Sequence, residues 1–174
     1  MGHLDRSALH GEFVTLRRTV PEDAARLLEI FSEPAVTEWW GRWDLAKVQR
    51  KMIDREDDTV VYVVLHDGVT IGLVQYAEEN DPDYRHAGID IALHPGWHGR
   101  GFGSDTIRTL ARHLFQHRGH HRITIDPATH NHRAIRSYER VGFRPVGVMR
   151  QYERGPDGTW HGGLLMDLLR DELI

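Results

Sequence analysis

A glycine-rich stretch is the part of this sequence whose residue types point most directly to chemistry. It follows an apolar run at residues 87–93 and reads His98-Gly99-Arg100-Gly101-Phe102-Gly103-Ser104. After it, apolar residues recur at the spacing of a buried helix face, namely Ile107, Leu110, Ala111, Leu114 and Phe115. Glycine lets backbone amides approach a ligand closely, and a helix N-terminus adds unpaired N–H groups and a positive dipole end. A strand, this loop and a helix therefore predict a site for an anion such as a phosphate.

Two known phosphate loops can be compared with this stretch. A P-loop ends in Gly-Lys-Ser/Thr, whereas here Gly103 is followed by Ser104 and Asp105, which excludes that motif. A dinucleotide-binding fingerprint requires a third glycine where Ser104 stands, although Asp126 lies roughly where its acidic residue belongs. The dinucleotide interpretation and a glycine-rich turn without a ligand both stay open on these residues alone.

Two aspartates stand at positions where a solvent-exposed surface carboxylate is not expected. Asp90 interrupts the apolar run from Ile89 to Leu93, where an unpaired charge is costly. Strand alternation places Ile89 and Ile91 on one face and Asp90 on the other. Asp126 ends the next strand just before Pro127, at an edge where α/β sheets open to ligands. Each is either a structural ion-pair partner or a group that binds or deprotonates a ligand.

A mixed α/β framework is predicted to position these residues. Alternating and β-branched runs predict strands at 11–19, 60–65, 70–76, 87–93, 122–126, 143–149 and 163–169. Helical spacing predicts helices from Pro21 to Pro34, in part of 35–53, over 107–115 and at 131–141, the last ending at Gly142. The sequence has no linker, repeat or low-complexity tract, so residues 1–174 are expected to form a single domain.

The composition narrows the classes of function. The 174 residues include 22 Lys and Arg against 26 Asp and Glu, a formal charge of -4 that argues against nucleic acid as a partner. The absence of cysteine excludes disulfides, cysteine-ligated metals and a thiol nucleophile. No apolar run approaches the ~20 residues of a membrane span, so a cytoplasmic protein without a membrane partner is expected. His113 and His117 have zinc-like spacing, but no third ligand motif follows, and no metal is predicted.

A second motif joins these features into a family resemblance. The spacing Asn131-x-x-Ala134-x-x-x-Tyr138-x-x-x-Gly142-Phe143 puts its first three named residues on one helix face. With the loop at 98–104, in which His98 replaces the usual Gln or Arg, the chain resembles the GNAT acetyltransferases. Further segments are similar to aminoglycoside 6′-N-acetyltransferases: Glu38-Trp39-Trp40-Gly41, Gly88-Ile89-Asp90, Asp126-Pro127 and Arg133-Ala134-Ile135-Arg136. The tail from Gly158 to Leu173 resembles the ribosomal-protein N-terminal acetyltransferases instead.

The resemblance implies a fold, a cofactor and roles for residues. The fold is a GNAT fold of the α/β (α+β) class, a mixed, mostly antiparallel sheet of about seven strands flanked by about four helices. The cofactor is acetyl-CoA, held by Ile91, Ala92, Leu93, His98, Gly99, Arg100, Gly101, Phe102, Gly103, Ser104, Asn131 and Ala134. Tyr138 would protonate the leaving thiolate, and Asp90, or else Asp126, would bind or deprotonate an amine that attacks the thioester directly.

The implied substrate is an aminoglycoside acetylated at its 6′-amine, an activity that confers antibiotic resistance. Such a polycation needs carboxylates around it, and Trp39 and Trp40 could stack on a sugar ring. The carboxylates expected to bind it are Glu38, Glu79, Asp81, Asp83 and Asp126. A solvated acidic loop and a packed helix pair are the structural alternatives. The functional alternatives are a ribosomal-protein-type N-terminal acetyltransferase and a non-catalytic acyl-CoA-binding module, and the chain is expected to be a monomer or homodimer.

Overall fold

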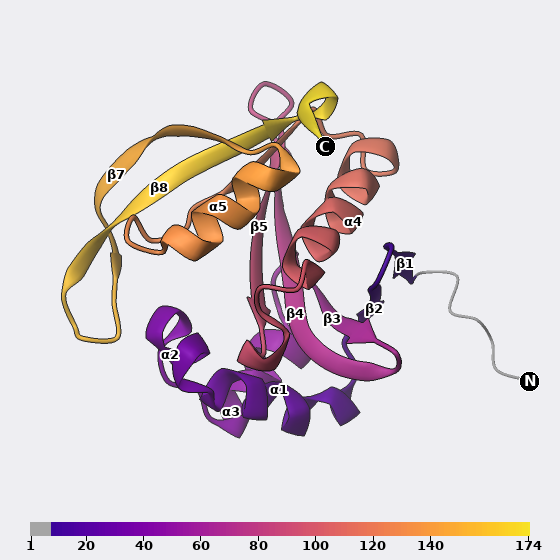
Figure 1. The fold of residues 1–174 in the computed structure, drawn as a ribbon, viewed down its shortest axis with the longest axis vertical. Helices are drawn as coiled ribbons and strands as arrows, with labels where there is room; N and C mark the ends of the chain where they lie inside the picture. The colour runs from indigo at the N-terminus through magenta and orange to yellow at the C-terminus, as the bar shows by residue number, and fades with distance from the viewer. Residues whose placement is uncertain (1–7) are drawn as a thin grey trace, which may run out of the picture.

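A computed structural model describes residues 8–174, and residues 1–7 lie outside the described part. One eight-stranded sheet runs through it in the order β1-β2-β3-β4-β5-β6-β8-β7 (Figure 1). Its neighbouring strands are antiparallel except for β5 and β6, which are parallel. The single parallel pair lies where the two halves of the chain meet.

The first half of the chain supplies five strands. These are β1 (Leu9–His10), β2 (Thr15–Arg18), β3 (Val60–His66), β4 (Val69–Glu79) and β5 (His86–Leu93). The turn between β3 and β4 is made by Asp67 and Gly68, whose φ angles are 48° and 77°, the positive values that a two-residue hairpin turn requires. β4 and β5 then pair without interruption, and Gln75 lies opposite Asp90.

β5 and β6 separate soon after they meet. β6 (Arg122–Ile125) pairs with β5 only at Ala87↔Ile123 and Gly88↔Thr124. Beyond that point β5 stays with β4, whereas β6 pairs with β8 (Trp160–Leu169), and β7 (Arg144–Arg154) forms the outer edge. The sheet therefore opens into a gap beside residues 89–93.

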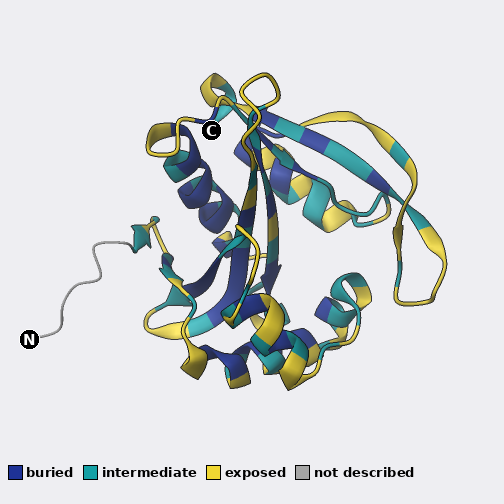
Figure 2. Ribbon diagram, turned by 180° about the vertical axis from the view of Figure 1, so that it is seen from behind, coloured by how far each residue is buried: buried dark blue, intermediate teal, exposed yellow. Residues whose placement is uncertain are grey.

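Helices cover both faces of the sheet (Figures 1 and 2). On one face, α4 (Phe102–Gln116) and α5 (His132–Val141) bury Leu110 and Tyr138 against strand residues such as Ile89. On part of the other face lie η1 (Pro21–Asp23), α1 (Ala24–Ser32), α2 (Pro34–Trp40), α3 (Leu45–Val48) and the π-helical turn η2 (Gln49–Ile53). Two short 3-10 turns, η3 (Pro95–Trp97) and η4 (Arg170–Glu172), follow β5 and β8.

The predicted mixed, mostly antiparallel α/β fold is confirmed, with two corrections. Within residues 8–174 the sheet has eight strands instead of about seven, because Leu9–His10 forms an additional strand, β1, that pairs with β2. The predicted strand at 11–19 is shortened to β2, because the backbone N–H groups of Glu12, Phe13 and Val14 turn toward the buried Asp105 carboxylate. The part of the chain that the structure describes forms five α-helices instead of about four, because Gly41, at a φ of 73°, ends α2 before α3 begins.

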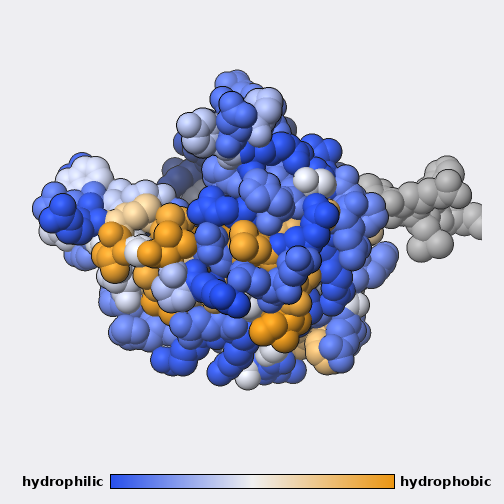
Figure 3. Space-filling view, turned by 90° about the horizontal axis from the view of Figure 1, so that it is seen from above, coloured by the Kyte–Doolittle hydropathy of each residue, from blue (hydrophilic) through white to orange (hydrophobic). Residues whose placement is uncertain are grey.

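β7 lies at one edge of the sheet, opposite to β1, and is largely exposed. Val146 and Val148 are among its exposed apolar residues, and the view from above shows hydrophobic patches within a mostly hydrophilic surface (Figure 3). Within residues 8–174, no helix has the length and apolar character needed to cross a membrane.

Candidate active site

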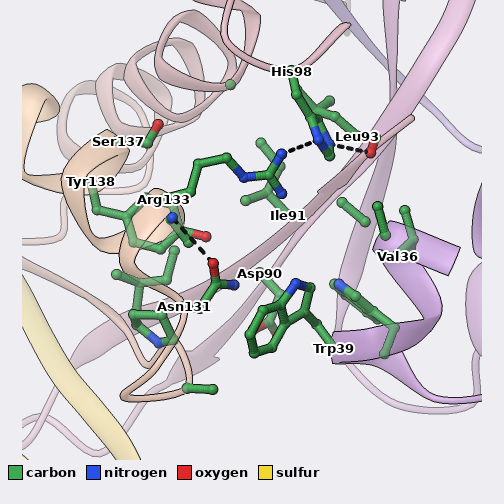
Figure 4. Close-up of a pocket in the computed structure, with 18 of the residues that line it drawn as sticks. Val36, Trp39, Asp90, Ile91, Leu93, His98, Asn131, Arg133, Ser137 and Tyr138 are labelled. Atoms are coloured by element: carbon green, nitrogen blue, oxygen red, sulfur yellow. Dashed lines mark hydrogen bonds between the residues drawn. The ribbon is translucent and has the colours of Figure 1, made fainter. Parts of the chain in front are cut away.

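A cavity of about 720 Å³ occupies the gap between β5 and β6. Its lining comes mainly from six places: β5, the glycine loop before α4, the segment 125–128 after β6, helix α5, helix α2 and the β7–β8 hairpin. Segments that are far apart in the sequence therefore meet around one space (Figure 4).

The glycine loop forms one wall of this cavity. Gly99 and Gly101 have φ angles of 69° and 85°, which L side chains rarely adopt, and Gly101 is the N-cap of α4. A Cβ at either position would meet no atom within 4 Å, so the backbone there is open. Gly103 and Ser104 also line the cavity, beside the N-terminal amides of a 15-residue helix. The wall is thus suited to an anion, as predicted from the sequence.

The side chains of Arg100 and Phe102 lie outside the cavity lining. Phe102 is buried against Phe13, and the Arg100 guanidinium lies over the Phe102 ring at 5.2 Å from its centre. These two predicted cofactor residues therefore do not line the cavity, and Phe102 anchors the loop to the core.

His98 links the two sides of the cavity. Its Nε2 donates a 2.7 Å hydrogen bond to the Leu93 carbonyl, and its Nδ1 accepts one from Arg133 on α5 (Figure 4). Burial lowers the pKa of His98, with the Leu93 bond opposing it and the Arg133 charge adding to it. A neutral imidazole thus ties the end of β5 to α5, where the family pattern has Gln or Arg.

The edge of β5 supplies unpaired backbone groups. The His94 N–H donates to the Ile71 carbonyl of β4, so the alternation of an antiparallel pair turns the N–H and C=O of Ile91 and the N–H of Leu93 toward the gap. The Leu93 C=O points the same way but accepts from His98. Asn131, across the gap, is the N-cap of α5, and its Oδ1 accepts from the Ala134 N–H at 3.3 Å. Ile91, Ala92, Leu93, Asn131 and Ala134 all line the cavity.

Tyr138 lies on α5, one turn after Ala134, and only 8% of it is exposed. Burial raises its pKa well above the usual range, and the negative charges of Asp90 and Asp126 act in the same direction. The phenol therefore keeps its proton at neutral pH and can donate it to a group in the cavity.

Asp90 also faces the cavity, from the opposite side of β5 to Ile89 and Ile91 as predicted. Its carboxylate is open to the cavity but enclosed by protein, and this desolvation raises its pKa. The nearby Asp126 raises the pKa further, while a 3.3 Å hydrogen bond from Gln75 opposes the shift. Asp90 is therefore a stronger base than an ordinary aspartate.

Asp126 and a residue that the sequence did not single out, Glu153 of β7, complete an acidic wall. Burial raises the pKa of Glu153, and Asp126 and Asp90 raise it further. Tyr152 donates a 2.6 Å hydrogen bond to Asp126. Trp39 and Trp40 line the same cavity, and the Trp39 ring lies 4.9 Å from that of His130.

Four predicted acidic residues, Glu38, Glu79, Asp81 and Asp83, are not in this wall. Glu38 is exposed on α2. Glu79 pairs with His86 in the β4–β5 register, four residues from the Gln75–Asp90 pair, or about 13 Å along the strand. Asp81 and Asp83 lie in the exposed turn beyond it. Of the acidic residues predicted to act on the acceptor, only Asp90 and Asp126 line this cavity.

Among residues 8–174 there is no group of three or more His, Cys, Asp and Glu side chains that could hold a metal ion. His113 and His117 instead stack on each other with ring centres 5.5 Å apart.

A family model described as the acetyltransferase (GNAT) domain matches residues 14–144. The chain belongs to the GNAT acetyltransferase family. It is therefore an N-acetyltransferase that uses acetyl-CoA. Matched residues 14–144 include the glycine loop, β5 and α5, but not Glu153 or the rest of the β7–β8 hairpin.

Several relatives of this GNAT protein are characterised. Aminoglycoside N(6′)-acetyltransferase type 1 of Klebsiella pneumoniae is 33% identical over 164 residues, which cover 83% of this chain and 79% of that protein. A kanamycin resistance protein of Rhizobium radiobacter is 38% identical over 84 residues, or 48% of this chain and 72% of that protein. A solved structure of AAC(6′)-Ib with coenzyme A and kanamycin has a TM-score of 0.77 at 30% identity, covering 91% of this chain and 96% of that one.

The cavity of this GNAT enzyme fits acetyl-CoA on its own chemistry. The open glycine backbone and helix N-terminus suit a pyrophosphate. The unpaired backbone groups at the edge of β5 suit the amides of a pantetheine arm, which need donors and acceptors in a buried groove.

Glu153, Tyr152, Gln75 and Arg133 were the site residues that sequence reasoning missed. Arg133 stood in a quoted motif without a role. Gln75 could have been found from its register opposite Asp90 once the β4–β5 hairpin was aligned. Nothing in the local sequence marks Tyr152 or Glu153, because a bulge in β7 places them.

Proposed function

We propose that this GNAT enzyme transfers acetyl from acetyl-CoA to the 6′-amine of an aminoglycoside, or of a sugar polyamine of the same kind. The observation that carries the proposal is the acidic wall of Asp90, Asp126 and Glu153 in the cavity that also holds Tyr138. Three carboxylates close together are costly unless cations neutralise them, and an acceptor with several ammonium groups supplies those cations. The similarity to aminoglycoside acetyltransferases at about one third identity supports the same substrate class.

In this proposal the amides of 98–104 hold the pyrophosphate, and the edge of β5 with Asn131 and Ala134 holds the pantetheine. Acetyl-CoA supplies the activated acetyl thioester. Asp90 removes a proton from the acceptor ammonium, so that the neutral amine can attack. As the bond from nitrogen to the acetyl carbon forms and the carbon–sulfur bond breaks, Tyr138 gives its proton to the departing sulfur, and the second proton lost by the nitrogen restores the phenol. Because the chain has no cysteine, transfer is direct rather than through a cysteine-bound acetyl group.

The acceptor lies in the proposal against Trp39 and Trp40, with its further amines on Asp126 and Glu153. An aromatic face suits the apolar side of a sugar ring, and carboxylates at the cavity wall suit its amines. Glu38, Glu79, Asp81 and Asp83 lie outside the cavity, so we assign the binding of the polycation to Glu153 in their place.

The test is thiol release from acetyl-CoA with purified protein against kanamycin, other aminoglycosides and peptides with free N-termini. We expect release with kanamycin, and a product whose NMR spectrum carries acetyl on the 6′-nitrogen. Release with peptides alone would favour the N-terminal acetyltransferase alternative. Binding of acetyl-CoA with no release for any amine would favour the non-catalytic module.

A further inference from the structure

The β7–β8 hairpin carries an irregularity beside the acidic wall. Met149 pairs with Gly163, and the next pair is Glu153 with His161, so four residues of β7 span the length of two on β8. Within this bulge Gln151 has a φ of 46°, a left-handed conformation that costs a non-glycine residue on the order of 1 kcal/mol. Backbone strain of this kind persists only where the surrounding structure holds it, so the contacts of the bulge identify what the strained conformation positions.

The bulge directs Tyr152 across β8 to Asp126. A Cβ at Gly163 would lie 2.7 Å from the ring atom Cδ1 of Tyr152, so only glycine leaves room for the ring there. The ring passes over that glycine, and the hydroxyl reaches Oδ2 of Asp126 at 2.6 Å, a distance typical of a hydroxyl bound to a carboxylate.

The segment that carries Asp126 is fixed to the same strand. The Leu164 N–H donates to the Pro127 carbonyl at 2.8 Å, and the Thr129 N–H donates to the Gly162 carbonyl at 3.1 Å. Backbone hydrogen bonds therefore hold the Asp126 backbone, and Tyr152 holds its carboxylate, so little freedom is left to that side chain.

The hydrogen bond between Tyr152 and Asp126 also keeps the Tyr152 phenol protonated, so that it remains a donor. Asp126 is the main cause that raises the pKa of Tyr152 to about 12, with burial second. The phenol is thus protonated throughout the neutral range, and a neutral donor occupies Oδ2 of Asp126 without adding charge. Oδ1 remains for a cation in the cavity.

We propose that Tyr152 is a positioning residue that sets acceptor specificity: it orients Asp126, and with Glu153 on the same bulge it builds a subsite for a second ammonium group of the acceptor. This rests on the proposed function, since it refines which amines that site accepts. In the proposal the reacting amine binds at Asp90, so the acetylation of an acceptor with a single amine does not depend on Tyr152.

The experiment compares Tyr152→Phe with wild type on two acceptors. Kanamycin carries several amines, whereas 6-amino-6-deoxyglucose carries only the equivalent of the reactive one. We expect KM for kanamycin to rise about tenfold with kcat within twofold, while kcat/KM for the monoamine and KM for acetyl-CoA stay unchanged. Asp126→Asn should also raise KM for kanamycin, and adding Tyr152→Phe to it should raise that KM little further. Tyr84→Phe, at an exposed tyrosine, is the matched control.

Calorimetric binding of kanamycin to the enzyme with coenzyme A gives a readout that does not need turnover. If Tyr152→Phe binds kanamycin more weakly than wild type does, but wild type does not acetylate kanamycin, the role of Tyr152 is supported and the proposed 6′-acetylation is contradicted. Two outcomes would overturn the role of Tyr152 alone, both with normal turnover of kanamycin by wild type. In one, Tyr152→Phe loses the same factor in kcat/KM on both acceptors; in the other, it loses none. If wild type binds no kanamycin, both fail. Equal thermal unfolding of the variants confirms that the fold is intact.

Discussion

Asp90 and Tyr138 face one gap from opposite faces of the sheet. Tyr138 packs in the α4–α5 core with Ile89, whereas Asp90 lies on the face that carries Leu73 and Ala92 under α1–α3. They are still close enough for the Asp90 charge to raise the pKa of Tyr138. In the proposed function, the group that takes a proton and the group that gives one therefore lie on opposite sides of the reacting atoms. This arrangement allows an amine to arrive on one face and a thiolate to leave on the other.

Tyr138→Phe tests the proton donor. The variant keeps the ring that packs in the core and loses only the hydroxyl, so the fold and KM for acetyl-CoA should change little. General acid catalysis contributes on the order of 100-fold or more, and kcat should fall by about that factor. Thiol release at saturating substrates measures it, and Tyr84→Phe is the control. Full turnover by the variant, with the step that releases the thiolate limiting the rate, would assign Tyr138 to packing.

Asp90→Asn tests the proton acceptor. Since burial and Asp126 raise the pKa of Asp90, the rate should increase with pH through that raised pKa, as the carboxylate becomes free to accept a proton. The asparagine variant should lose about 100-fold in kcat/KM for the amine and should lose that acidic limb of the pH profile. Asp83→Asn, in the exposed turn outside the cavity, serves as the matched variant. An unchanged rate and profile in Asp90→Asn would make Asp90 structural and leave Asp126 as the base.

Asp105→Ala tests the contact that divides β1 from β2. The buried carboxylate accepts from the backbone N–H groups of Glu12, Phe13 and Val14 at 2.8–3.0 Å, more than 90 residues away in sequence. Removing this carboxylate from α4 leaves the three N–H donors between β1 and β2 without a partner. The free energy of unfolding should fall by about 3 kcal/mol, measured by urea denaturation. Asp105→Asn should cost less, and the exposed Asp58→Ala should cost almost nothing. A small loss in Asp105→Ala would mean that water replaces the carboxylate.

Much of the fold was predictable because its signals are local. The turn at Asp67-Gly68, the strand from Ala87 to Leu93 and the C-cap at Gly142 each follow from residue type and spacing, and the structure confirms them. The shortening of the strand predicted at 11–19 to Thr15–Arg18 was not predictable, because the backbone of residues 12–14 binds a carboxylate far along the chain. A helix-breaking φ at Gly41 was not anticipated either, since the neighbouring residues all suit a helix.

The site was predictable on its cofactor side and less so on its acceptor side. The loop at 98–104 and the Asn131–Tyr138 face carry their spacing in the sequence, and the structure brings them to one cavity. The acidic wall depends on strand register, which places Gln75, not Glu79, opposite Asp90. It also depends on the bulge in β7, which places Glu153 of this edge strand at the cavity. The acidic residues that precede Asp90 in the sequence instead lie toward the turn of the β4–β5 hairpin, outside the cavity lining.

His120→Gln tests how pH acts on stability. His120 is fully buried, its Nε2 lies 3.0 Å from Glu78, and its Nδ1 has no hydrogen-bond partner in the part of the chain that the structure describes. Burial lowers the pKa of His120 in the folded protein, and burial lowers the pKa of His98 and His113 as well. The unfolded chain therefore binds protons first as the pH falls below about 6.5, and the stability that neutral histidines provide above that pH is lost progressively below it.

Glu78 does not contribute to this loss between pH 7.5 and 5, because Arg118 and His120 lower its pKa to about 2 and it stays ionised. We expect the free energy of unfolding of wild type, from urea denaturation at several pH values, to decrease between pH 7 and 5. Glutamine at 120 can still donate to Glu78 but does not titrate, so His120→Gln should show a shallower decrease. His132→Gln, at an exposed histidine, should reproduce the wild-type slope. Equal slopes in wild type and His120→Gln would show that the buried imidazole takes up its proton without cost to the fold.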